Sequence, residues 1–159
     1  MNSIAAPLTP RARRRSRNAT VQHLIAADEH SFAPLQALLA TLPLCSTGRI
    51  FIEVPDQSAI VPIDAPARMT VTWLTRDSRS GQPGSGKRCR RGMALTRAVT
   101  AWANEMFVAE HDAAESSTHI TLMGGYVSTA DITEHLVDNM GVDAAVIDTP
   151  AEFGILPRH

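Results

Sequence analysis

The fold is decided by residues 21–42, which read VQHLIAADEHSFAPLQALLATL. The first seven of them form a short apolar run followed by polar residues, as is typical of a buried strand. Ser31 then offers a helix N-cap, and Pro34 is acceptable in a first helical turn. Apolar residues follow at helical spacing, at Leu35, Leu38, Leu39 and Leu42. This stretch therefore predicts a strand followed by a helix.

The same alternation continues along the rest of the chain. Short apolar or β-branched runs predict strands at residues 49–54, 69–75, 119–123 and 144–148. Helical periodicity covers residues 93–107 and 128–140. Strands that alternate with helices pair in parallel through right-handed crossovers. We therefore predict a three-layer α/β/α, doubly wound, Rossmann-like sheet of five parallel strands in the order 3-2-1-4-5.

Length and composition limit the classes of function. The 159 residues correspond to one domain, and a hydrophobic content of 44% is enough for an ordinary core. No run of about 20 apolar residues is present, so no membrane span is predicted. Neither a secretory signal nor a disulfide framework is indicated, which favours the cytoplasm. Cys45 is predicted to be a core thiol and Cys89 a loop thiol.

Basic charge is concentrated near the N-terminus of a chain whose net charge is −1. Five arginines lie between Arg11 and Arg17 with no acidic residue before position 20. Residues 1–18 are therefore predicted to be a disordered basic tail, and residues 19–159 the folded domain. A solvated tail is favoured over a nucleic-acid anchor, because a short unstructured basic run reads no sequence. Residues 76–92, rich in Gly, Ser and Arg, are predicted to be a long mobile loop.

Ligands of doubly wound sheets lie beyond the carboxyl ends of the strands, where the strand order reverses. This rule selects the loops at residues 27–31, 55–57 with 75–76, and 124–128. The first loop has no glycine, so the GxGxxG dinucleotide fingerprint is absent. A helix N-terminus that could receive a pyrophosphate remains. Asp28 and Glu29 would repel that group unless they point away or cap the helix, and capping is the favoured alternative.

Other chemistries find little support in the sequence. The six histidines show no pair at the i, i+4 spacing of a helical metal site, so no metal site is predicted. Residues 81–88, GQPGSGKR, lack the Ser or Thr that a phosphate-binding P-loop needs after its lysine. Trp73 and Trp102 are predicted to lie in the core. No side chain is predicted to be catalytic.

Three segments carry a resemblance: HLIAADEHSFAP (23–34), GRIFIEVPD (48–56) and VTWLTR (71–76). Their order resembles the C-terminal domain of siderophore-interacting proteins, over about residues 21–141. Members of that family are flavin-dependent ferric-siderophore reductases with a ferredoxin-reductase-like organisation. The resemblance implies that this domain binds NADPH or NADH, while a preceding β-barrel domain holds FAD.

The matched positions imply where the cofactor would bind. The family's first loop usually reads Gly-Asp-Glu-Thr, and here Ala27 and His30 replace its first and last residues. Arg76 follows the third strand, where its guanidinium is expected to meet a ribose phosphate, with a solvated loop charge as the alternative. Residues 27–31 are expected near the pyrophosphate and residues 124–126 near the nicotinamide half. The implied cofactor-binding set is Ala27, Asp28, Glu29, His30, Ser31, Asp56, Arg76, Gly124, Gly125 and Tyr126.

Several departures from the family pattern shape the expected function. The pair Gly124-Gly125 stands where the family has Gly-Glu, and the family's closing Gly-Tyr-Trp segment is missing. The residues before Val21 are too few for a flavin barrel, so we expect that this chain alone does not bind FAD. A separate FAD-binding protein is then the expected partner, and ferric siderophore would be met only indirectly.

Two functions stay open at this point. The chain is either a stand-alone NAD(P)H-binding-type domain, such as the nucleotide half of a split flavoprotein reductase in iron acquisition, or a noncatalytic binding or partner-docking module that has lost the cofactor site. Any nucleotide binding is expected to be weak, because Asp28 and Glu29 place negative charge beside an anionic ligand. Whether the chain is an enzyme, and whether NADPH or NADH is its nucleotide, both stay open.

Overall fold

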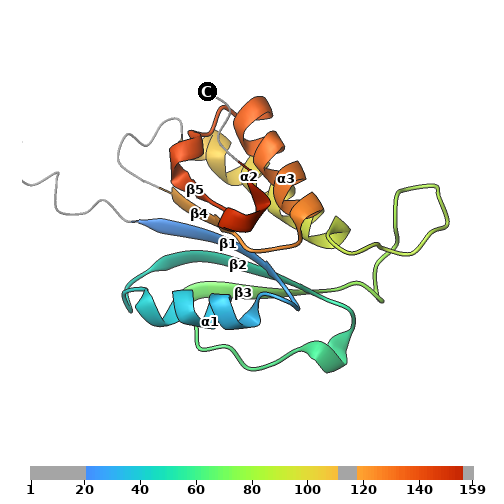
Figure 1. Ribbon diagram of the computed structural model, residues 1–159, viewed down its shortest axis with the longest axis horizontal. Coiled ribbons are helices and arrows are strands. Elements are labelled where there is room, and N and C mark those ends of the chain that lie inside the picture. Colours follow the sequence, from blue (N-terminus) through green and yellow to red (C-terminus); the bar gives the residue numbers. More distant parts are fainter. Residues whose placement is uncertain (1–20, 111–117, 156–159) are drawn as a thin grey trace, which may run out of the picture.

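A computed structural model describes residues 21–110 and 118–155, so the predicted tail at residues 1–18 lies outside the described residues. Within them, strands alternate with helices (Figure 1). The strands are β1 (Gln22–Asp28), β2 (Thr47–Val54), β3 (Arg68–Thr75), β4 (Thr118–Leu122) and β5 (Ile147–Asp148). The α-helices are α1 (Phe32–Thr41), α2 (Met93–Glu110) and α3 (Tyr126–Glu134). In the described part of the chain, no helix is both long enough and apolar enough to cross a membrane.

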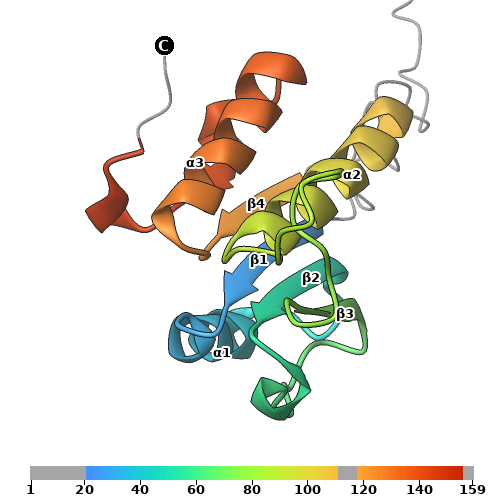
Figure 2. The same ribbon diagram turned by 90° about the vertical axis from the view of Figure 1, so that its right-hand side faces the viewer.

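The five strands form one parallel sheet in the order β3-β2-β1-β4-β5. Strand β1 is central, since Gln22 lies opposite both Thr47 of β2 and Thr118 of β4. Helix α1 covers one face of the sheet, and α2 and α3 cover the other (Figure 2). The predicted three-layer, doubly wound architecture and its strand order are confirmed.

Two apolar cores lie on the two faces of the sheet. On β1, Leu24 and Ala26 face α2 and α3, whereas Ile25 and Ala27 face α1, and all four are fully buried. A strand covered on both faces has no polar alternation, which explains the continuous apolar run in the sequence. The two tryptophans, predicted to lie in the core, are only partly buried and pack against these cores, with Trp73 on the α1 side and Trp102 on the α2 side.

The start of α1 differs from the sequence prediction. Ser31 occupies the N-cap position, but its hydroxyl makes no capping hydrogen bond to the helix. Instead Oγ accepts the N–H of Asp28 at 2.9 Å and donates to the carbonyl of the same residue at 3.1 Å. The prediction of a serine cap is therefore wrong, because the hydroxyl closes the β1–α1 turn and is already used there.

The secondary structure of the last third of the chain is less regular than the sequence predicts. Helix α3 begins at Tyr126, two residues before the predicted start, and continues as one π-helical turn, η4 (His135–Asn139). Strand β5 has only two residues, because a 3-10 turn, η5 (Ala144–Val146), takes up most of the predicted strand. The Asp143 carboxylate stabilises this turn by accepting the N–H of Ala145 at 3.0 Å. Two further 3-10 turns are η3 (Gln57–Ala59) and η6 (Ala151–Phe153).

Residues 76–92 contain neither helix nor strand, but residues 80–88 fold back on themselves as a hairpin. Ser80 and Arg88 form an antiparallel bridge, and the N–H of Gly81 donates to the carbonyl of Lys87 at 2.7 Å. The segment projects from the side of the molecule where the strands end (Figure 1). Cys89 behind it is 8% exposed and packs in the core, whereas Cys45 is exposed. The predictions of a core thiol at Cys45 and a loop thiol at Cys89 are therefore both wrong. Cys89 is buried because it anchors this segment to the core.

Candidate functional site

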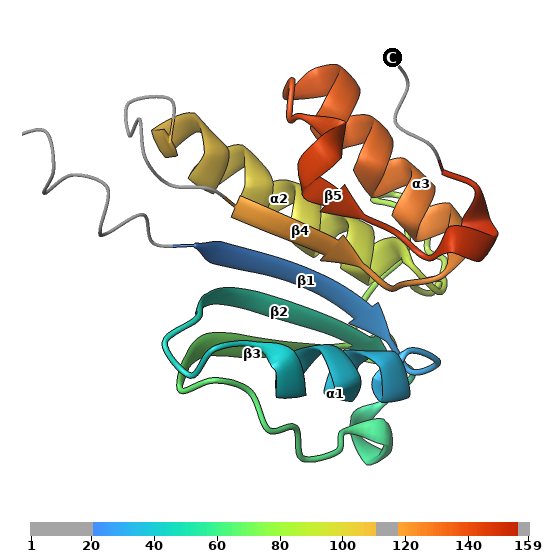
Figure 3. The same cartoon turned by 60° about the vertical axis from the view of Figure 1, so that its left-hand side comes forward.

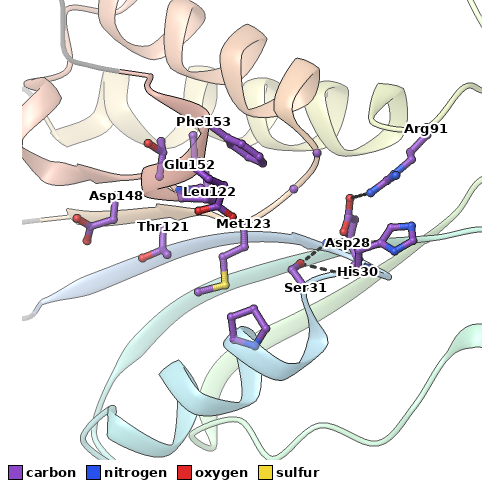
Figure 4. A pocket seen from close by; sticks show the side chains of 15 residues that line it. Asp28, His30, Ser31, Arg91, Thr121, Leu122, Met123, Asp148, Glu152 and Phe153 are labelled. Atoms are coloured by element: carbon purple, nitrogen blue, oxygen red, sulfur yellow. Dashed lines mark hydrogen bonds and ion pairs between the residues drawn. The ribbon is translucent and has the colours of Figure 1, made fainter.

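A cavity of about 500 Å³ lies beyond the carboxyl ends of β1, β4 and β5. Figure 3 shows β1 and β4 side by side, with their chain continuations leading to α1 on one face and α3 on the other. The strand order therefore reverses at this point, as expected for a ligand site in a doubly wound sheet. The walls come from the β1–α1 loop, the end of β4, the turn before α3 and the segment that follows β5 (Figure 4).

An aspartate and an arginine form one wall of the cavity. Asp28, at the end of β1, is almost fully buried, and its Oδ2 pairs with Nη2 of Arg91 at 2.7 Å. Its Oδ1 accepts the N–H of His30 at 2.9 Å, so the β1–α1 turn fixes the carboxylate. The Arg91 side chain is 48% exposed. This arginine therefore presents cationic surface to solvent while it neutralises a buried acid.

A second cluster of charges lies next to the cavity and is centred on Arg76. Its guanidinium donates two hydrogen bonds to Glu29, at 2.8 and 3.0 Å, and a third to Glu53 at 3.1 Å. Its side chain is 16% exposed. Two carboxylates therefore neutralise Arg76 within the fold.

The pKa values of these groups follow from the same contacts. Burial raises the pKa of Glu29, but the hydrogen bonds and charge of Arg76 outweigh it, so the net pKa lies below the ordinary value. Hydrogen bonds to Glu29 raise the pKa of Arg76 further above its ordinary value. Both groups are therefore charged throughout the physiological range.

Glu53, in the middle of the cluster, ties the sheet to the start of α2. The side chain is completely buried, and its two oxygens accept the N–H groups of Gly92 at 2.7 Å and Leu95 at 2.8 Å. These N–H groups belong to the helix start, where the backbone lacks partners and favours negative charge. Gly92 has a φ of +85°, which disfavours any residue with a side chain. A single carboxylate therefore joins β2, the arginine after β3 and helix α2.

The remaining cavity wall combines an apolar part with acidic groups. Met123 and Phe153 project toward the cavity, and Asp148 and Glu152 lie at the β5 side (Figure 4). The Phe153 ring meets the exposed ring of Tyr126 edge to face, with centroids 5.6 Å apart. The cavity thus offers an apolar surface, carboxylate acceptors and one arginine.

The predicted site residues separate into two groups. Asp28, His30, Ser31, Gly124 and Gly125 line the cavity together. The other five do not line it: Ala27 is buried in the core facing α1, Glu29 and Arg76 pair with each other, Asp56 caps η3, and Tyr126 packs on Phe153. The favoured capping role of Asp28 and Glu29 is wrong, because neither carboxylate bonds to the start of α1 and both pair with arginines instead.

Sequence reasoning missed several members of the site. Arg91 had a signal in the sequence, since it lies two residues before a predicted helix in an arginine-rich stretch. Phe153 and Glu152 had none, because only the fold brings the segment after β5 back beside Gly125. Glu53 lies within the segment 48–56 that carries the family resemblance, but its contacts with α2 depend on residues about 40 positions away.

The fold, with a cavity where its strand order reverses, defines a Rossmann-like α/β domain. A family model described as siderophore-interacting protein matches residues 20–150. The chain belongs to this family.

Curated relatives include the ferric vibriobactin reductase ViuB of two Vibrio cholerae strains. Each is 33% identical over 61 residues, which make up 38% of this chain and 22% of the relative. The chain thus spans less than a quarter of the length of these relatives.

Solved structures support the fold. The siderophore-interacting protein SipS from Aeromonas hydrophila matches with a TM-score of 0.54 and 16% identity, over 82% of this chain and 50% of SipS. A siderophore utilization protein from T. fusca matches with a TM-score of 0.56 and 20% identity, over 83% of this chain and 44% of that protein. The chain therefore has the fold of about half of each of these proteins.

Proposed function

We propose that this chain is the nicotinamide-nucleotide-binding domain of a ferric-siderophore reductase. One observation carries the proposal: a chain of the siderophore-interacting family has a cavity of about 500 Å³ where its strand order reverses. Related chains named ferric vibriobactin reductase support the reaction class. The flavin is held by a separate domain or protein, which acts as the partner in the cytoplasm and transfers electrons to the ferric siderophore.

The residues of the cavity suit the nicotinamide nucleoside half of NADH or NADPH. Met123 and Phe153 provide apolar surface against which a flat ring packs. The carboxylates of Asp148 and Glu152 are acceptors for ribose hydroxyls. Arg91, at the opposite wall, donates to the oxygens of the diphosphate. When bound, the nucleotide supplies the hydride, and the residues of this chain hold and orient it.

A second candidate function is a noncatalytic binding module, and the charge of the cavity favours it. Asp28, Asp148 and Glu152 all line the cavity, whereas Arg91 is already paired with Asp28. Negative charge beside a diphosphate opposes binding, so such a module would have kept the sheet without the cofactor.

Calorimetric titration with NADH and NADPH separates the two functions. We expect weak binding by the wild-type chain and a loss of roughly tenfold to a hundredfold in Arg91→Ala, because a charge-assisted hydrogen bond is removed. Arg68→Ala is the control. It changes an exposed residue at the N-terminal end of β3 that does not line the cavity, and this variant should bind as wild type. The absence of heat at millimolar nucleotide would reject the proposal and favour the noncatalytic module.

The same titration tests the predicted contact between Arg76 and a ribose phosphate. If Arg76 makes this contact, Arg76→Ala weakens NADPH roughly tenfold to a hundredfold and NADH less, because NADH lacks the 2′-phosphate. Equal isotherms for Arg76→Ala and wild type would remove Arg76 from the site. Thermal unfolding of each variant must accompany the titration, because Arg76 also holds Glu53.

A further inference from the structure

A second cavity, of about 620 Å³, lies between the 80–88 hairpin, the start of α2 and the first turns of α3. Its walls include Lys87, Met93 and Ser128, one from each of these elements. Arg91 borders both this cavity and the first one. The two cavities are otherwise formed by different residues.

Positive charge gathers around this second cavity. Five of the nine Lys and Arg residues in the described part of the chain line it, namely Lys87, Arg88, Arg90, Arg91 and Arg97. Asp131 is the single carboxylate among the described residues that line it. No other lysine or arginine lies between Arg97 and Arg158, and the chain as a whole is slightly acidic. The charge is therefore local and does not reflect a generally basic protein.

The basic hairpin is held in place by contacts within the fold. Arg97 on α2 donates to the carbonyls of Ser80 at 3.0 Å and Gly81 at 2.7 Å. The bridge between Ser80 and Arg88 closes the hairpin, and the buried Cys89 fixes the chain directly behind it. The cations are therefore presented on a preformed surface, which lowers the entropy lost on binding a ligand.

Three of the five cations have neither a carboxylate nor a hydrogen-bond partner for their side chains among the described residues. Arg91 pairs with Asp28, and Arg97 is engaged by two carbonyls. Lys87, Arg88 and Arg90 are exposed and form no ion pair with any residue that the structure describes. Like charges placed together at a concave surface repel one another unless an anion lies between them.

We propose that this second cavity binds a small phosphate-class anion. Guanidinium groups match phosphate oxygens with paired donors, and four of the five cations that line this cavity are arginines. The cavity has no aromatic side chain among its described lining residues, so it offers no platform for a nucleobase or another flat ring. Recognition therefore rests on the anionic group itself.

Two sources could supply this phosphate. One is a free inorganic anion such as pyrophosphate. The other is the phosphate of a nucleotide whose remaining part lies in the first cavity, since Arg91 borders both. The chemistry of recognition is the same for both, so competition has to identify the source.

The test is calorimetric titration of the full chain with sodium pyrophosphate at low ionic strength. We expect saturable binding that weakens as salt is added, because exposed charges are screened. The double variant Lys87→Ala/Arg88→Ala should bind at least tenfold more weakly. Arg68→Ala also removes an exposed cation, but outside the cavity, and it should bind as wild type. Neither position of the double variant lines the first cavity, so a change in NADH binding is not expected.

The outcomes separate this proposal from the proposed function. The absence of pyrophosphate binding, or equal weakening by Arg68→Ala, would overturn the second site whatever the result with NADH. Competition of NADPH but not NADH with pyrophosphate would support the site and assign its phosphate to the nucleotide. Pyrophosphate binding that neither nucleotide displaces would support the site and assign it to a free anion.

Discussion

Glu53 is a buried acid whose partners are all supplied by the fold. Its carboxylate accepts two backbone N–H groups at the start of α2 and one donor of Arg76, and it has no exposed surface. Removing one partner of such a group leaves others unsatisfied, which costs more than a surface ion pair is worth. Glu53 is thus the residue on which the joint between β2, the segment after β3 and α2 depends.

We predict that Glu53→Gln lowers the free energy of unfolding by about 2–4 kcal/mol, because the amide places a donor against backbone donors and removes the charge that offsets Arg76. Urea denaturation followed by circular dichroism measures the effect. Glu105→Gln, an exposed change on α2, should stay within about 0.5 kcal/mol of wild type. Equal stability of the two variants would contradict the structural role of Glu53.

Glu29 predicts a pH dependence of stability. Its pKa in the fold lies below the ordinary value of 4.5, despite burial, because Arg76 stabilises the charged form. The carboxylate therefore contributes stability above pH 4.5, and this contribution is lost as the pH falls through the lowered pKa. At neutral pH, Glu29→Gln should cost about 1 kcal/mol relative to wild type.

Denaturant unfolding of wild type and Glu29→Gln at neutral pH and at successively lower pH checks this sign. The difference between the two proteins should shrink as the pH falls below 4.5. A difference that grows on acidification would show that the Arg76 pair does not stabilise the charged form.

At the scale of elements, the pattern of apolar residues predicts the strands and the long helices well. Helices cover both faces of the sheet, so the buried strands appear in the sequence as apolar runs and the helices as apolar residues at helical spacing. The short run 144–148 is predicted as a strand but is mostly a 3-10 turn, since the Asp143 side chain competes locally for backbone N–H groups. Residue patterns do not show which carboxylate meets which arginine. The pairs Asp28–Arg91 and Glu29–Arg76 join residues 63 and 47 positions apart.

The start of α2 depends on a glycine as well as on Glu53. Gly92 has a φ of +85°, and a Cβ there would lie 3.0 Å from the Cβ of Ser128 on α3. Gly86 also has a positive φ, of +62°, but a Cβ there would meet nothing within 4 Å. The two glycines therefore separate the cost of backbone strain from the cost of crowding.

We predict that Gly92→Ala destabilises the protein by about 2–3 kcal/mol, through left-handed backbone strain plus displacement of α3. Gly86→Ala should cost only the strain, about 1 kcal/mol. Thermal unfolding of both variants gives the comparison. If the two alanine variants unfold at the same temperature, crowding between the new Cβ at position 92 and Ser128 does not contribute to the destabilisation.

At the scale of the whole molecule, the candidate site is predicted in location but only partly in composition. Its place follows from topology, because an all-parallel sheet with the order 3-2-1-4-5 has its strand-order reversal between β1 and β4. Its charges could not be predicted, since the residue that resembled a free phosphate ligand, Arg76, is held by two carboxylates.

The whole chain is expected to purify colourless and to be inactive alone in NAD(P)H oxidation with ferric chelates. Under the proposed function a separate domain or protein holds the flavin, and the residues that the structure describes form a single parallel sheet. Absorption spectra of the purified protein and an assay with added flavoprotein measure this. A yellow protein with stoichiometric FAD, or rapid reduction without the flavoprotein, would contradict the expected division of labour.

The central position of β1 also affects how the chain can fold during synthesis. Among the five strands of the sheet β1 is synthesised first, and one side of it pairs with β2 soon afterwards, but its other side must wait for residues 118–122. At translation rates of about 5–20 residues per second, the interval between them lasts roughly 5–20 s. During this interval, one edge of the apolar strand β1 is unpaired and can form hydrogen bonds with non-native strands. The ribosome-bound chain is therefore most vulnerable to aggregation before the second half of its sheet emerges.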